Sequence, residues 1–120
     1  MSPDDRDPAY LHDIFKAGGR IGVLLKGVSL EKFRDDWTSR LAVERLFEII
    51  GEAARRISQE TQAIYADIPW REMIGLRNVI SHNYDKIDDD EIFQIATKDI
   101  PSLIEGIGRI LREMDDSSQT

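Results

Sequence analysis

Apolar residues along this chain recur every three or four positions, which is the spacing of one face of an α-helix. The first stripe follows Asp7 and Pro8, which we interpret as a helix N-cap and a first helical residue. Its members are spaced 3, 4, 3, 4 and 3 apart: Leu11, Ile14, Gly18, Ile21, Leu25 and Val28. The pair Gly18-Gly19 predicts either a locally loose helix or a neighbour that approaches closely.

The middle of the chain continues the same helical period. Ser29 can cap a short piece that ends at about Asp36, and a long segment then runs from Trp37 or Thr38 to about Ser58. This long segment is apolar over a wide arc, which is typical of a helix that is central in a bundle or shared with a partner chain. We expect a polar turn over residues 59–62 after it.

Two further helical segments complete the chain. The first restarts at residues 67–70, where Pro69 fits a first helical turn. The second begins near Asp88, which is followed three residues later by Glu91 in a capping arrangement. Pro101 predicts a kink or a restart near Asp99 in this last segment.

The pattern predicts an all-α fold, an antiparallel bundle of four to five helices, because no strand-like alternation is present and the connections are short. With 120 residues and 41% hydrophobic content the chain can bury one core. We therefore expect a single domain over residues 1–120, with a core at about 7–114 and a frayed tail at 115–120.

The composition of the chain argues against stabilisation by cysteines, against a membrane span and against broad binding of nucleic acid. The chain has no cysteine, so neither disulfides nor a thiolate zinc site can hold the fold together. No apolar run is long enough to span a membrane and no secretory leader is recognisable, so we expect a soluble, cytoplasmic protein. The net charge of −7 argues against broad, non-specific binding of nucleic acid, so any RNA contact has to be local.

The sequence R-N-V-I-S-H-N-Y, residues 77–84, concentrates chemically versatile side chains. On one straight helix Arg77 and His82 lie about 140° apart around the axis and about 7.5 Å apart along it, so they do not converge. Either the helix unwinds before His82, or a second copy of the chain completes the site. Gly75, on the same side as His82, favours a homodimer because it lets another backbone approach.

This motif matches the R-x4-H-x-Y signature of the HEPN superfamily, and the chain resembles the HepT-like toxins of HepT/MntA toxin–antitoxin pairs. The resemblance covers roughly residues 10–112. Its further matches, in order, are Ala42-Val43-Glu44-Arg45, Glu48-Ile49-Ile50-Gly51-Glu52-Ala53, Ile68-Pro69-Trp70-Arg71, Gly75-Leu76-Arg77-Asn78 and Asp99-Ile100-Pro101. The signature alone is weak, but five ordered matches are specific.

The resemblance implies an all-α domain that forms a homodimer, with both motif helices lining one cleft, and a metal-independent endoribonuclease activity without cofactors. With two histidines and no cysteine, a transition-metal site is hard to build. An imidazole suits proton transfer from a ribose 2′-OH and a guanidinium suits phosphate oxygens, so we assign these catalytic roles to His82 and Arg77. Asn78, one turn before His82, can orient its ring. We expect a 2′,3′-cyclic phosphate product.

Tyr84 has a different expected role. A phenol titrates near about 10 and is a poor acid or base at neutral pH. The resemblance implies that Tyr84 accepts AMP from an MntA-like nucleotidyltransferase antitoxin. An AMP group two residues from His82 adds bulk and negative charge, which would block an RNA phosphate.

Simpler interpretations stay open for each residue. His82 can be a helix-dipole partner, Arg77 an interhelical ion pair, Asn78 an exposed residue and Tyr84 a packing residue. His12 is expected at the surface. We expect Arg55, Arg56 or another chain to compensate the acidic ladder Glu44, Glu48 and Glu52. We expect Trp37 and Trp70 to be core or interface anchors. The rival functions are a non-catalytic RNA- or nucleotide-binding subunit and a structural dimerisation module.

Overall fold

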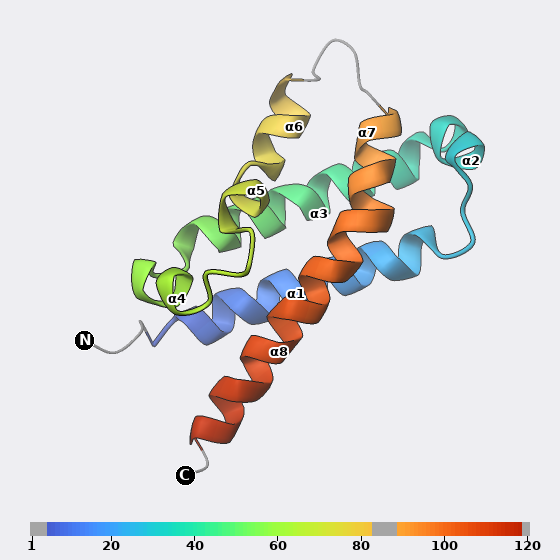
Figure 1. The fold of residues 1–120 in the computed structure, drawn as a ribbon. Helices are drawn as coiled ribbons and strands as arrows, with labels where there is room; N and C mark the ends of the chain where they lie inside the picture. The colour runs from blue at the N-terminus through green and yellow to red at the C-terminus, as the bar shows by residue number, and fades with distance from the viewer. Residues whose placement is uncertain (1–4, 83–88, 119–120) are drawn as a thin grey trace.

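The computed structural model describes residues 5–82 and 89–118, with the side chains of 80–82 and 117–118 left aside. Within these ranges every regular element is helical, which confirms the predicted all-α class. The elements are α1 (Asp7–Leu25), α2 (Leu30–Asp35), α3 (Trp37–Arg56), α4 (Gln59–Ile64), α5 (Trp70–Ile74), α6 (Leu76–His82), α7 (Asp89–Gln94), a π-helical segment (Ile95–Asp99) and α8 (Ile100–Ser118) (Figure 1).

The helices pack as a bundle around α1 and α3. These two run side by side in opposite directions, with α2 between them in the chain (Figure 1). The rod formed by α7, the π-helical segment and α8 crosses α1, whereas α5 and α6 pack on α3. Fully buried side chains from all three long helices form one core: Leu11, Ile14, Ile21, Val43, Phe47, Ile50, Ile107 and Ile110.

Side-chain caps explain where α2 and α3 begin. Ser29 Oγ accepts a hydrogen bond from Lys32 N, and Asp36 Oδ1 accepts one from Ser39 N, so α2 and α3 begin at or within one residue of their predicted positions. A Cβ on Gly18 would collide with the side chain of Ile104. The closely approaching neighbour is therefore the correct interpretation of this glycine.

The predicted role of Asp7 as a cap of α1 is wrong. Arg6 occupies the N-cap position, and Asp7 is a buried first-turn residue. Its carboxylate instead accepts hydrogen bonds from Ser58 N at 3.0 Å, Ser58 Oγ at 2.6 Å and Thr61 Oγ1 at 2.6 Å. Asp7 thus joins the beginning of α1 to the beginning of α4.

The polar turn predicted over residues 59–62 is also wrong, because these residues form the first part of α4. Ser58 Oγ accepts from Thr61 N at 3.2 Å, so the polar residues that suggested a turn cap a short helix instead. A polar stretch predicts a turn or a capped helix start equally well, and the partner that decides between them, Asp7, is 51 residues away from Ser58.

The restart predicted near Asp99 is a change of helical type and not a break. Residues 95–99 are π-helical and lead directly into α8, so the chain stays helical from Asp89 to Ser118, and Pro101 is the second residue of α8. The frayed tail predicted from residue 115 is wrong, since α8 continues to Ser118. Asp88, the predicted cap of the preceding segment, lies outside the described residues.

The two tryptophans differ. Trp70 is buried and its Nε1 donates to the carbonyl of Tyr65 at 3.0 Å, which confirms it as a core anchor. Trp37 is 62% exposed, so a core position for it is wrong, and its role at an interface stays a prediction. Among the helices of the described ranges, none combines the length and the apolar content that crossing a bilayer requires.

Candidate functional site

The residues of the motif lie on α6, which follows α5 after a break at Gly75. Gly75 N donates to Arg71 O at 2.9 Å, and Gly75 O accepts from Asn78 N at 2.9 Å, so one short helix ends and another begins around this residue. The single straight motif helix is therefore wrong at Gly75. The helical spacing of Met73, Leu76 and Ile80 predicts one buried face, and Met73 and Leu76 are both buried.

Helix α6 also decides one of the two alternatives for the divergence of Arg77 and His82. The helix remains helical through His82, so unwinding before that residue is wrong. A Cβ on Gly75 would lie 3.3 Å from Arg71 O and 3.4 Å from Glu72 O, both in its own chain. Gly75 thus serves the break between α5 and α6, and completion of the site by a second copy stays a prediction.

Arg77 contacts α3 at two points. Its Nη1 donates to Glu52 Oε2 at 3.0 Å, which confirms the interhelical ion pair considered from the sequence. Its aliphatic stem passes Gly51, where an added Cβ would lie 3.0 Å from Arg77 Cγ and 3.3 Å from the carbonyl oxygens of Ile74 and Met73. Two consecutive residues of α3 therefore position the stem and the head of Arg77.

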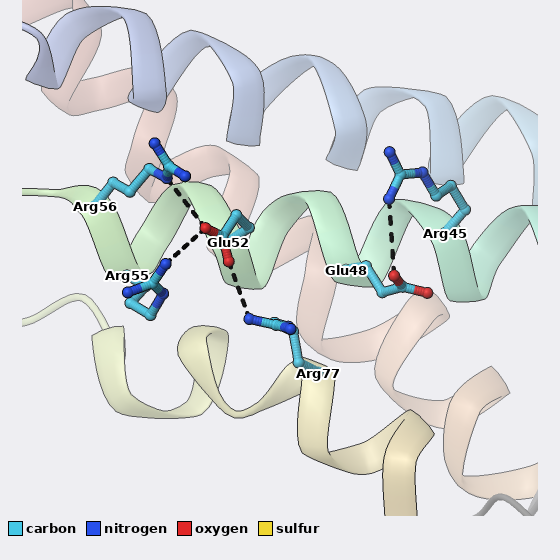
Figure 2. A network of polar contacts seen from close by, with 6 residues as sticks. All are labelled: Arg45, Glu48, Glu52, Arg55, Arg56 and Arg77. Atoms are coloured by element: carbon cyan, nitrogen blue, oxygen red, sulfur yellow. Dashed lines mark hydrogen bonds and ion pairs between the residues drawn. The ribbon is translucent and has the colours of Figure 1, made fainter.

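Glu52 is shared by three guanidinium groups. Its Oε1 accepts from Arg55 Nη2 at 2.7 Å and from Arg56 Nε at 3.1 Å, while Oε2 accepts from Arg77 (Figure 2). Figure 2 shows Arg56 on the side of α3 that faces α1, and Arg77 on the side of α6. We call Glu52, Arg55, Arg56 and Arg77 the arginine cluster.

The hydrogen bonds in this cluster change the ionisation of its members. Those from Arg55 and then Arg56 lower the pKa of Glu52 from 4.5 to about 2, so the carboxylate stays charged at any physiological pH. Hydrogen bonds to Tyr10 first and to Glu52 second raise the pKa of Arg56. Three cations and one anion give the arginine cluster a formal charge of +2, inside a chain whose total is −7.

The rest of the acidic ladder on α3 is compensated in a different way. Glu48 Oε2 lies 3.7 Å from Arg45 Nη1, which is a loose, exposed pair (Figure 2). Glu44 is partly buried, and this burial raises its pKa despite the nearby charge of Arg40. The expectation that Arg55 or Arg56 compensates this ladder is confirmed for Glu52, whereas Glu48 is paired with Arg45.

The other predicted residues are placed as follows. Asn78 is exposed on α6, next to Arg77, and His12 is exposed on α1 as expected. His82 is the last residue of α6, and its side chain lies outside the described part of the structure. Tyr84 also lies outside the described residues, so its roles remain predictions.

Two hollows occur near the described helices. One has a volume of about 290 Å³ and lies between α1 and α3, beside the arginine cluster, with Tyr10 and Ile49 in its wall. The other, about 930 Å³, lies between residues 67–72 and α8, and no residue of the motif lines it. Among the described side chains, no three of His, Cys, Asp or Glu gather closely enough to hold a metal ion.

The sequence indicated Arg55 or Arg56 as a partner of Glu52, but it did not identify Gly51, Glu52, Arg55 and Arg56 as parts of the site with Arg77. One signal was present, because the segment Glu48 to Ala53 belongs to the ordered matches with the HepT-like family. The pairing itself left no mark in the spacing of the sequence, since Arg77 is 25 residues from Glu52.

Comparison with known proteins gives concordant matches. A family profile described as "Ribonuclease HepT-like" matches residues 14–110. A protein of Methanocaldococcus jannaschii named "Putative RNase MJ1380" is 35% identical over 95 residues, covering 79% of this chain and 87% of the relative. "Probable ribonuclease HepT" of Thermococcus cleftensis is 36% identical over 94 residues, covering 78% and 86%. No solved structure shows significant similarity to the chain.

Proposed function

Because this chain belongs to the HepT-like ribonuclease family, we propose that it is a metal-independent endoribonuclease whose active site is completed in a homodimer. The proposed catalytic residues are Arg77, Asn78 and His82. The observation that supports this most is the position of Arg77, whose half-exposed guanidinium is held on α3 by Gly51 and Glu52. A fixed cation that solvent still reaches is suited to an RNA phosphate.

The proposed reaction is an attack of the ribose 2′-oxygen on the adjacent phosphorus. His82 takes the proton of the 2′-OH, and Arg77 stabilises the charge that develops on the non-bridging oxygens. The bond from phosphorus to the 5′-oxygen breaks, and that oxygen takes a proton from a protonated imidazole or from water. The products carry a 2′,3′-cyclic phosphate and a 5′-hydroxyl.

The two histidines of the chain offer a matched test of this chemistry. We expect His82→Ala to abolish cleavage of RNA, whereas His12→Ala, at an exposed position of α1, cleaves like the parent protein. Cleavage in EDTA should equal cleavage in Mg²⁺. Equal rates for the His82→Ala variant and the parent would eliminate the proposed reaction and favour a binding subunit.

Mixing two inactive variants tests the dimeric site. In a dimer of one Arg77→Ala chain and one His82→Ala chain, a site that takes Arg77 from one subunit and His82 from the other keeps both groups once. We expect activity to return on mixing, measured with a fluorogenic RNA. If mixing restores nothing while each variant still dimerises, Arg77 and His82 act from the same chain.

We also propose that the chain is the toxin of a toxin–antitoxin module, in which a partner nucleotidyltransferase silences it by adding AMP to Tyr84. The modification places a phosphate two residues from His82, where it repels the substrate. Co-expression with the transferase should give an AMP adduct on the peptide that contains Tyr84, detected by mass spectrometry. Expression without the transferase should arrest growth and degrade RNA. An unmodified peptide with full toxicity would contradict this regulation.

A further inference from the structure

The arginine cluster has more guanidinium groups than Glu52 can neutralise. Arg55, Arg56 and Arg77 meet one carboxylate, and each side chain is 53–56% exposed. A guanidinium carries five N–H donors, and the bonds to Glu52 use one on each arginine. Most donors of the cluster therefore remain available on the side of solvent.

The charge around the cluster contrasts with that of the whole chain. The total charge of the chain is −7 and the cluster carries +2, so the remaining residues together carry −9. An acidic protein repels a polyanion everywhere except where positive charge is concentrated. Among the other charged residues that line the neighbouring hollow, Arg45 and Glu48 form a neutral pair and Asp13 adds one negative charge, so the positive charge of the cluster is reduced but not cancelled.

The cluster is also ordered before any ligand arrives. Glu52 accepts hydrogen bonds from Arg55, Arg56 and Arg77, and Tyr10 of α1 lines the same hollow as Arg56. Ordered side chains lose less conformational entropy when they bind, so a preformed cluster binds anions more tightly than mobile arginines do. The cluster extends from Arg77 on α6 to the last turn of α3, so positive charge is also present beyond the proposed catalytic arginine (Figure 2).

We propose that Arg55 and Arg56 form a second phosphate-binding site, which holds an RNA phosphate adjacent to the one that Arg77 contacts. This inference rests on the proposed ribonuclease function and identifies how an acidic protein holds its substrate. Arg55 and Arg56 act in binding, so their loss raises KM and leaves kcat nearly unchanged, whereas loss of His82 removes kcat.

Salt-dependent binding tests the second site. The probe is a fluorescein-labelled, mixed-sequence, single-stranded RNA, and the His82→Ala background prevents cleavage during the titration. We expect Arg55→Ala/Arg56→Ala to raise Kd roughly tenfold at low salt and to reduce the slope of log Kd against log salt by about 0.7, because the second site holds one phosphate and each phosphate neutralised on a single strand contributes about 0.7. Arg55→Lys/Arg56→Lys keeps both charges and should retain most of that slope.

The matched control is Arg109→Ala, which removes an exposed arginine that is also paired with a carboxylate but lies on α8. It should change neither Kd nor the slope. If the double alanine variant stays folded and binds RNA with the Kd and slope of its parent, the second phosphate site does not exist. A parent that binds no RNA overturns it as well.

Cleavage assays with an intact His82 separate this inference from the proposed function. If the parent binds RNA through Arg55 and Arg56 but cleaves none, the ribonuclease function fails and the second site stands. If the parent cleaves RNA and the double alanine variant has the same KM, the second site fails and the ribonuclease function stands.

Discussion

Among the exposed ion pairs that join separate helical regions in the described part of the chain, Arg109–Asp67 and Arg77–Glu52 differ in charge balance more than in length. Arg109 of α8 and Asp67, which precedes α5, lie 2.6 Å apart, whereas Arg77 and Glu52 lie 3.0 Å apart. The shorter pair is one cation with one anion and adds no net charge. The longer pair belongs to a cluster with three cations for one anion. The excess of cations, and not the length of the ion pair, distinguishes the candidate site.

A glycine lies beside each pair, and the two glycines have different neighbours. A Cβ on Gly106 of α8 would lie 2.6 Å from Ile68 Cδ1, the mobile end of a side chain. A Cβ on Gly51 would meet the stem of Arg77 and two backbone carbonyls. The missing Cβ at Gly106 therefore leaves room for the side chain of Ile68, whereas the missing Cβ at Gly51 lets the backbone before Arg77 approach α3.

The largest expected difference between the two pairs is in catalysis. Arg77→Ala should reduce kcat/KM for RNA cleavage by about 100-fold or more, the usual loss when one preorganised group that stabilises transition-state charge is removed. Arg109→Ala should cleave within about twofold of the parent protein. Initial rates on a fluorogenic RNA measure both. Equal losses in the two variants would remove the distinction drawn above.

The second difference concerns the glycines. Gly51→Ala should reduce cleavage by roughly tenfold, because the stem of Arg77 has to shift by tenths of an ångström and catalysis is sensitive to such displacements. Gly106→Ala should leave cleavage unchanged, since Ile68 can adopt another rotamer.

Thermal unfolding provides the control for both glycine variants. An alanine inside a helix is favoured over glycine by about 0.5–1 kcal/mol, so neither variant should lose much stability. A loss of cleavage in Gly51→Ala that is matched by a large drop in Tm would contradict a local displacement of Arg77.

The third difference separates charge from orientation. Glu52→Gln raises the formal charge of the cluster from +2 to +3, so RNA should bind about two- to threefold more tightly at low salt. The same change removes the charged partner of Arg77, so kcat should fall several-fold. Asp67→Asn adds the same charge beside Arg109 and should change neither quantity. A parallel change in both variants would indicate a general effect of net charge.

The smallest difference is in acid stability. The pKa of Glu52 is about 2 in the folded protein and near 4.5 when unfolded, so its charged form favours folding above pH 4.5. That contribution is lost as the pH falls from about 4.5 to about 2. Urea unfolding at pH 7 and pH 3 should therefore show a gap between the parent and Glu52→Gln that narrows in acid. A gap that is constant with pH would mean that ionisation of Glu52 does not stabilise the fold.

Local sequence predicted the parts of the fold that depend on neighbours in the chain. The beginnings of α2 and α3 follow from Ser29 and Asp36, which cap within three residues, and the π-helical segment ends two residues before Pro101. Distant partners could not be predicted. Aspartate is a residue type that commonly caps helices, but the hydrogen bonds of Asp7 go to Ser58 and Thr61, which are 51 and 54 positions away in the sequence.

The candidate site was predictable in type and not in partner. The motif placed Arg77 and His82 on one helix, and the structure agrees. That helix is shorter than predicted because α5 and α6 are separated at Gly75. The φ of Gly75 is −70°, a value that any residue adopts, so the break has no distinctive sequence signal. Spacing could not choose Glu52 among 23 acidic residues, since that choice depends on the approach that Gly51 permits.

The break at Gly75 separates α6 from α5, so a small tilt of α6 at this residue would displace the far end of the helix. Arg77 is fixed to α3 near the beginning of this helix, while His82 stands at its far end, about 10 Å along the axis from Gly75. A tilt of about 10° at the break would displace that end by about 2 Å, and a displacement near 1 Å can cost about 100-fold in rate. Substitutions at the break around Gly75, far from any reacting atom, should therefore change activity without altering a catalytic group.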